Sequence, residues 1–123
     1  MTDFIERYSI VLDALLDKAK SDAERDLCGE RPTRKARLQG AIDAIEDCDG
    51  KGPGDLEYML EDQTPTKACP DGTNQIFYDA EYERTLKWIC ECMSVFLVLN
   101  GQSEICNPSG PAALEMLSVC QGL

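Results

Sequence analysis

The chain has 123 residues, of which 43% are hydrophobic and 28% are charged, and its formal net charge is −11 with no histidine. This length suits a single domain over residues 1–123, which buries roughly two thirds of its unfolded surface. A charge of this sign repels nucleic acid and anionic lipid, and the longest candidate for a membrane span, residues 93–99, is too short to cross a membrane. The N-terminus lacks the pattern of a secretion signal, so we expect a cytoplasmic location.

Three helices are predicted in the N-terminal half. Apolar side chains at three- and four-residue steps indicate an amphipathic helix over residues 3–27, with Thr2 as its N-cap. The same spacing predicts a second helix from about Pro32 or Thr33 to Cys48. A glycine-rich break follows, and Asp55 can cap a short third helix over residues 55–63.

The C-terminal half predicts a loop and two further helices. Residues 64–74 contain two prolines and a glycine, which indicates a flexible loop. A hydrophobic helix over about residues 78–100 follows, with Asp79 as its N-cap, and a short helix opens at Ser109 or Gly110. The fold class is therefore all-α, a compact bundle of four to five helices around the 78–100 helix, although a strand within residues 94–99 is the alternative.

Acidic side chains are concentrated in residues 43–62, called here the acidic segment. Its eight carboxylates are opposed only by Lys51, so the segment carries −7 of the net charge. Such a density attracts basic protein surfaces at long range. We predict that these eight residues bind a host protein with a basic surface: Asp43, Glu46, Asp47, Asp49, Asp55, Glu57, Glu61 and Asp62.

The expected function is that of a non-enzymatic protein-binding module. By analogy of size and charge with DNA mimics and some anti-CRISPR proteins, we expect an inhibitor encoded by a phage or other mobile element, acting in the host cytoplasm. Duplex DNA carries one charge per ~1.7 Å of axis, and closely spaced carboxylates can imitate that density on a basic groove. Two alternatives stay open: a metal-dependent, all-α enzyme resembling nucleotide pyrophosphohydrolases, and a charge that serves only solubility.

No catalytic residue, metal ligand or cofactor is predicted. Without histidine, a serine or cysteine nucleophile lacks its usual base. Asp43, Glu46 and Asp47 share one helix face, but a magnesium site of that kind needs a second carboxylate-bearing helix opposite. Cys90 and Cys92 point about 200° apart on a helix and cannot grip one ion. The seven cysteines are an odd number without an export signal, so we expect free thiols that mostly fill the core.

Residues 47–58 resemble the calcium loop of an EF-hand. The resemblance covers the first, third and ninth ligand positions and the turn glycine, which are Asp47, Asp49, Asp55 and Gly52. Lys51 occupies the fifth ligand position, and Tyr58 stands where the bidentate glutamate belongs. The loop is therefore interpreted as a glycine-rich turn between two helices.

Two further surfaces are predicted. Residues 95–99 are apolar on every face of a helix, and a small domain has few neighbours to cover them. We therefore expect a symmetric homodimer whose interface comprises Val95, Phe96, Val98 and Leu99. The alternative is that the remaining helices wrap this segment completely, which would make it the central core of a monomer. The basic cluster at the start of the second helix is expected to be a solvated face paired with acids of the first helix: Arg31, Arg34, Lys35 and Arg37.

Overall fold

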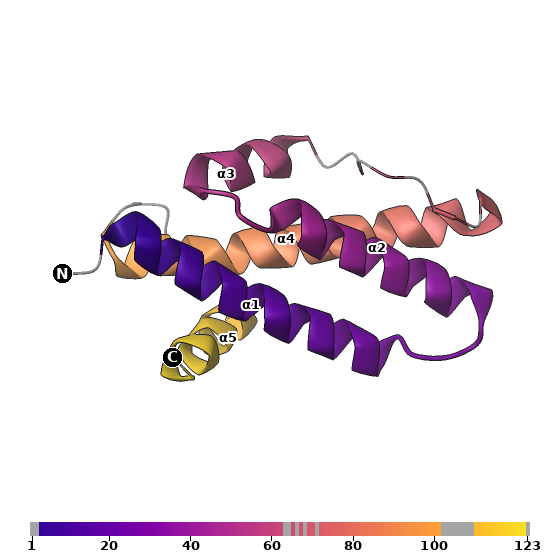
Figure 1. Cartoon of the computed structure of the whole chain (residues 1–123), viewed down its shortest axis with the longest axis horizontal. Helices are drawn as coiled ribbons and strands as arrows, with labels where there is room; N and C mark the ends of the chain where they lie inside the picture. Colours follow the sequence, from indigo (N-terminus) through magenta and orange to yellow (C-terminus); the bar gives the residue numbers. More distant parts are fainter. Residues whose placement is uncertain are drawn as a thin grey trace.

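The computed structural model describes residues 3–62, 65, 67, 69, 70, 72–101 and 110–122. They form five α-helices and one short 3-10 turn, and no strand occurs among them, so the all-α prediction is confirmed. Residues 94–99 are helical, which rules out the strand alternative. The elements shown in Figure 1 are α1 (Phe4–Asp26), α2 (Pro32–Cys48), α3 (Pro53–Glu61), the turn Gly72–Asn74, α4 (Gln75–Leu99) and α5 (Gly110–Gln121).

Helix α4 contacts each of the other four helices. Helices α2 and α4 lie side by side and run in the same direction, whereas α1 runs the opposite way (Figure 1). Helix α3 lies over one side of α4, and α5 lies on the other side of the bundle. No helix in the described ranges is both long and apolar enough to cross a bilayer.

The core is built from buried apolar residues of all five helices, with the largest share from α1 and α4. Leu12 and Leu15 of α1 are buried with Leu86, Ile89 and Met93 of α4. Aromatic rings close the end of this core near the start of α1, where the ring centroids of Phe4 and Phe96 lie 5.8 Å apart and those of Tyr8 and Phe96 lie 5.9 Å apart. The spacing of apolar residues predicted the buried stripes of α1 and of the first part of α4, but not the contacts of Phe96 with Phe4 and Tyr8.

Phe96 and Val95 belong to this core, which corrects their assignment to a dimer interface. Their residues are only 6% and 4% exposed in the single chain, because α4 is covered here by the other helices. Of the four predicted interface residues, Val98 is half-buried and Leu99 is 66% exposed. Homodimerisation itself stays a prediction.

Helix boundaries differ from the sequence prediction at two starts. Helix α3 begins at Pro53, which suits the first helical turn, and Asp55 accepts the Gly52 N–H at 3.2 Å from inside that turn. Helix α4 begins at Gln75, so Asp79 is not its N-cap and instead accepts a 2.7 Å hydrogen bond from Gln75 Nε2. The N-cap position of α1 is Asp3, and α5 begins at Gly110, one of its two predicted first residues. Thr2 and Ser109 lie outside the described residues.

The predicted flexible loop 64–74 lies partly outside the described residues. Of the described part, Gly72–Asn74 form the 3-10 turn that leads into α4. Cys69 is buried, and its backbone N–H donates to the Gln75 side chain at 3.0 Å. This part of the loop therefore packs against the start of α4.

A stripe of small residues lets α2 approach α4 closely. The stripe recurs every four residues and comprises Ala36, Gly40, Ala44 and Cys48, all of them buried. A Cβ atom at Gly40 would lie 2.4 Å from the carbonyl oxygen of Tyr78, so only glycine fits against this backbone. The close approach determines where the polar side chains beside the stripe meet α4.

Candidate functional site

The structure divides the eight predicted partner-binding carboxylates into two groups, and Asp43 belongs to the interior. Asp43 is 3% exposed and accepts hydrogen bonds from Gln39 Nε2 at 2.8 Å and from the Tyr78 hydroxyl at 2.5 Å. Lys67 Nζ lies 3.9 Å from the same carboxylate. A buried charge needs such partners, and Asp43 has them within the chain. Its place on an exposed binding surface is therefore a wrong prediction.

Asp47 repeats this arrangement one helical turn along α2. Its carboxylate accepts a 2.5 Å hydrogen bond from the Tyr82 hydroxyl, and it is half-buried. Because α2 and α4 run parallel, Asp43 and Asp47 meet Tyr78 and Tyr82 in the same order. Burial and these hydrogen bonds raise the pKa of both tyrosines well above the ordinary value. These two Tyr–Asp pairs hold α2 and α4 together.

Glu46 is exposed but already has a basic neighbour. Lys67, from the segment before α4, donates to Glu46 at 2.8 Å, and this interaction raises the pKa of Lys67. The shared face of Asp43, Glu46 and Asp47 therefore contacts α4 and Lys67.

The remaining five carboxylates are all exposed: one follows the end of α2, three lie on α3, and one follows the end of α3. We call them the α3 acidic surface: Asp49, Asp55, Glu57, Glu61 and Asp62. Residues 49–62 contain one base, Lys51, so this stretch has a net charge of −4. Tyr58 is 69% exposed and Leu60 39% exposed among these acids. Exposed aromatic and apolar side chains among charges are typical of protein interfaces.

The EF-hand-like loop forms a short turn between α2 and α3. Gly50 adopts a φ of 73°, and the Lys51 N–H donates to the carbonyl oxygen of Cys48 at 3.2 Å. Asp47, which corresponds to the first ligand position, is hydrogen-bonded to Tyr82. Among the described residues, no group of three or more cysteines and carboxylates is arranged to hold a metal ion.

An apolar groove runs between α3, α4 and the start of α1. We call it the α3 groove; its volume is about 520 Å³. Tyr8, Leu56 and Met93 are buried residues of its lining, whereas Leu60 and Glu57 line it from the exposed part of α3. The buried thiol of Cys90 also lines the groove, where its Sγ donates to the Leu56 carbonyl oxygen at 3.6 Å.

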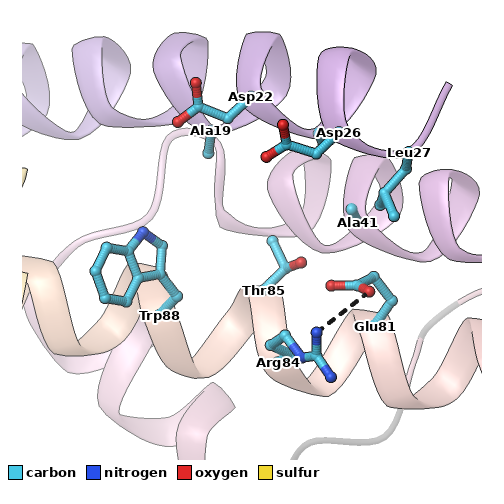
Figure 2. Close-up of a pocket in the computed structure, with 10 residues that line it drawn as sticks. Ala19, Asp22, Asp26, Leu27, Ala41, Glu81, Arg84, Thr85 and Trp88 are labelled. Atoms are coloured by element: carbon cyan, nitrogen blue, oxygen red, sulfur yellow. Dashed lines mark ion pairs between the residues drawn. The ribbon is translucent and has the colours of Figure 1, made fainter. Parts of the chain in front are cut away.

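A second cleft of about 260 Å³ lies between α1 and α4 (Figure 2). Asp22 and Asp26 project from α1, and Glu81, Arg84 and Trp88 project from α4. Each carboxylate has a basic neighbour: Asp22 lies 3.1 Å from Lys18, Asp26 lies 3.0 Å from Arg25, and Glu81 lies 3.9 Å from Arg84. The cleft therefore carries paired charges.

Six described cysteines are free thiols, as predicted, and Cys106 lies outside the described residues. Burial raises the pKa of Cys48 and Cys92 to about 12 and that of Cys90 to about 11. Cys90 faces α3. Cys92 instead interacts electrostatically with Lys18 of α1 and Glu115 of α5. The two thiols thus point to different helices, which agrees with their helical spacing.

The basic cluster at the start of α2 has other partners than the predicted acids of α1. Arg34 donates to the carbonyl oxygens of Asp26 and Cys28 at 3.3 Å each, at the C-terminal end of α1. Lys35 lies 3.5 Å from Glu30, and Arg37 lies over the Phe77 ring at 5.2 Å. Arg34 therefore stabilises a helix end, where unpaired carbonyl groups favour a cation.

Comparisons with protein-family models, curated proteins and solved structures found no match for this chain. Its function therefore has to be inferred from its own residues and geometry. The contact at Gly40 and the α3 groove were both unpredicted. The four-residue spacing of small residues in α2 was a readable signal for the contact at Gly40. The α3 groove has no local signal, because it depends on how far α3 stands from α1.

Proposed function

We propose that this chain is a non-enzymatic protein-binding module and that the α3 acidic surface contacts a basic surface of another protein. The observation that carries the proposal is the exposure of five carboxylates on α3 and in the residues that flank it, opposed in that stretch only by Lys51. Local charge of one sign attracts an oppositely charged partner and speeds its association.

The proposed contact surface includes only part of the acidic segment. Asp43 and Asp47 accept hydrogen bonds from tyrosines of α4 and belong to the scaffold. Glu46 is exposed but already lies 2.8 Å from Lys67, so we leave it out of the proposed contact surface. A basic surface that normally binds nucleic acid is the partner chemistry that fits best, because it is built to meet closely spaced negative charges. An inhibitor encoded by a mobile element and acting by DNA mimicry is the form of this proposal that we favour.

A differential pull-down tests the proposal. The bait variant Asp49→Lys/Glu57→Lys/Glu61→Lys reverses three exposed acids of the α3 acidic surface. The matched control Asp13→Lys/Asp17→Lys/Glu24→Lys reverses three exposed acids of α1, and both variants contain one pair of acids four residues apart. Because the net charge changes equally, only the location of the reversal differs. We expect proteins captured from a bacterial extract by the wild type and the control to be lost with the α3 variant. Identical captures with both variants would contradict the proposal.

A further inference from the structure

Helix α3 combines an apolar row and an acidic row that lie next to each other. Leu56 and Leu60 are four residues apart and line the α3 groove. Glu57 and Glu61 have the same spacing and follow them by one residue. Residues four apart lie on one helix face, so the acidic row runs alongside the apolar row. Glu57 belongs to the acidic row and also lines the groove.

We propose that the α3 groove binds the apolar side chains of a basic amphipathic segment from the partner protein. The lysines or arginines of that segment would meet Glu57 and Glu61 at the edge of the groove. This inference rests on the proposed function and names the partner's chemistry at the same surface. It gives a role to Leu60, which lines the groove and is 39% exposed next to the acidic row.

Size and charge support this occupant. A volume of about 520 Å³ falls within the range of about 300–1,000 Å³ that binding pockets typically have. Apolar anchors in the centre with charges at the rim are the usual anatomy of a protein interface. A purely apolar partner would leave the acids at the rim without partners, and an acidic partner would be repelled.

A second copy of this chain is a poorer occupant on charge grounds. Each copy has a net charge of −11, and the stretch 49–62 that borders the groove is −4. A symmetric contact places the same patch of both copies together, so the α3 acidic surface would face itself. Repulsion between the two acidic surfaces opposes such a contact, whereas the same surface attracts a basic segment.

Three synthetic peptides test the proposal by fluorescence anisotropy. Each has about 18 residues, which as a helix spans about 27 Å. The first is an amphipathic Leu/Lys peptide, the second replaces its leucines with serine, and the third replaces its lysines with glutamate. We expect the Leu/Lys peptide to bind at least about tenfold more tightly than the Ser/Lys peptide, since buried anchors carry most of the affinity. We expect the Leu/Glu peptide not to bind.

A groove-filling variant localises this binding. Ser94 is exposed at the edge of the groove, so Ser94→Phe adds a ring there without entering the core, and Ser21→Phe is the matched control on α1. We expect Ser94→Phe to reduce the affinity for the Leu/Lys peptide to that for the Ser/Lys peptide, and Ser21→Phe to leave it unchanged. Leu60→Gln, compared with Leu114→Gln on α5, gives a second test at positions 39% and 68% exposed. Circular dichroism checks that each variant is folded.

The outcomes separate the groove from the wider proposal. Equal binding of the Leu/Lys and Ser/Lys peptides would overturn the groove while leaving the acidic surface as the contact. Failure of both lysine peptides to bind would overturn the groove and the proposed function together. Binding of the Leu/Glu peptide as tightly as the Leu/Lys peptide would overturn the basic occupant. A dimer in sedimentation that Ser94→Phe dissociates would assign the groove to a second copy and overturn the proposal.

Discussion

Tyr78 of α4 donates its hydroxyl proton to the carboxylate of Asp43 of α2 at 2.5 Å, and both residues are buried. The backbone of Tyr78 is also the one that Gly40 approaches. One residue of α4 thus meets α2 through its carbonyl group and its hydroxyl group. Residues on the inner face of the acidic segment therefore build the scaffold, and those of the α3 acidic surface remain exposed for a partner.

Loss of the Tyr78 hydroxyl should destabilise the fold. Tyr78→Phe removes one donor from a buried carboxylate, and a buried polar group deprived of a partner costs about 1–3 kcal/mol. Urea unfolding followed by circular dichroism measures this change. Tyr58→Phe is the matched control, because Tyr58 is 69% exposed, and it should change stability by less than about 0.5 kcal/mol. Equal stability of Tyr78→Phe and wild type would contradict the structural role of the pair.

Stability should decline in alkaline solution. The pKa of Cys48 and Cys92 is raised to about 12 in the folded chain, and the pKa values of Tyr8, Tyr78 and Tyr82 are also raised. These groups lose protons more readily when unfolded. The contribution of these protonated groups to the free energy of unfolding is therefore complete below about pH 9. It is lost as the pH rises towards the pKa values that the groups have in the folded chain.

Urea unfolding at about pH 7.5, 9 and 10.5, with reductant present, measures this decline. Cys92→Ala removes one of the groups with a raised pKa, so its stability should fall less steeply with pH than that of the wild type. A free energy of unfolding that stays constant over this range would show that burial of the thiols and phenols does not influence folding.

Gly40→Ala should destabilise the chain even though alanine is the better helix former. The added Cβ would lie 2.4 Å from the Tyr78 carbonyl oxygen, so α2 and α4 must separate. Gly54→Ala is the control, because no atom lies within 4 Å of a Cβ there, and it should stabilise α3 by up to about 1 kcal/mol. Thermal unfolding compares the two variants, and a rise in Tm for Gly40→Ala would disprove the close approach.

Thiol reactivity should divide the cysteines by burial. Cys28 and Cys120 are exposed and should react at once with a thiol reagent at neutral pH. Cys48, Cys90 and Cys92 are buried with a raised pKa, so they should react only after unfolding. Mass spectrometry of the labelled peptides checks each position. Rapid labelling of Cys48 or Cys92 in the native protein would contradict the packing of α4.

Periodicity predicted the helices because each one buries a stripe of apolar residues. The bounds of α2 agreed, since Pro32 and the Gly50 turn limit that helix locally. The starts of α3 and α4 were less predictable, because a proline is tolerated in the first turn of α3 and a 3-10 turn extends the start of α4. Such ends depend on backbone context rather than on spacing.

Burial of individual acids could not be read from the sequence. Asp43 and Glu57 are equivalent in charge, and only the tertiary position of Tyr78 distinguishes the buried carboxylate from the exposed one. Val95 and Phe96 were predicted at an interface between two chains and lie in the core of one chain. The sequence could not decide between these places, because an apolar residue on α4 packs equally well against another helix or a second chain. The sequence showed the density of charge in residues 43–62, but it did not show which of these acids are buried in the scaffold and which are exposed on the surface.

The rate of association with the Leu/Lys peptide tests the central claim, that the α3 acidic surface attracts a basic partner. Stopped-flow fluorescence gives this rate at about 10 mM and about 100 mM salt, between which the screening length falls from about 30 Å to about 10 Å. We predict that the α3 reversal Asp49→Lys/Glu57→Lys/Glu61→Lys slows association at low salt at least about tenfold and nearly abolishes its salt dependence. The α1 reversal Asp13→Lys/Asp17→Lys/Glu24→Lys should slow it far less. Equal slowing by the two reversals would attribute the attraction to net charge alone and contradict the account.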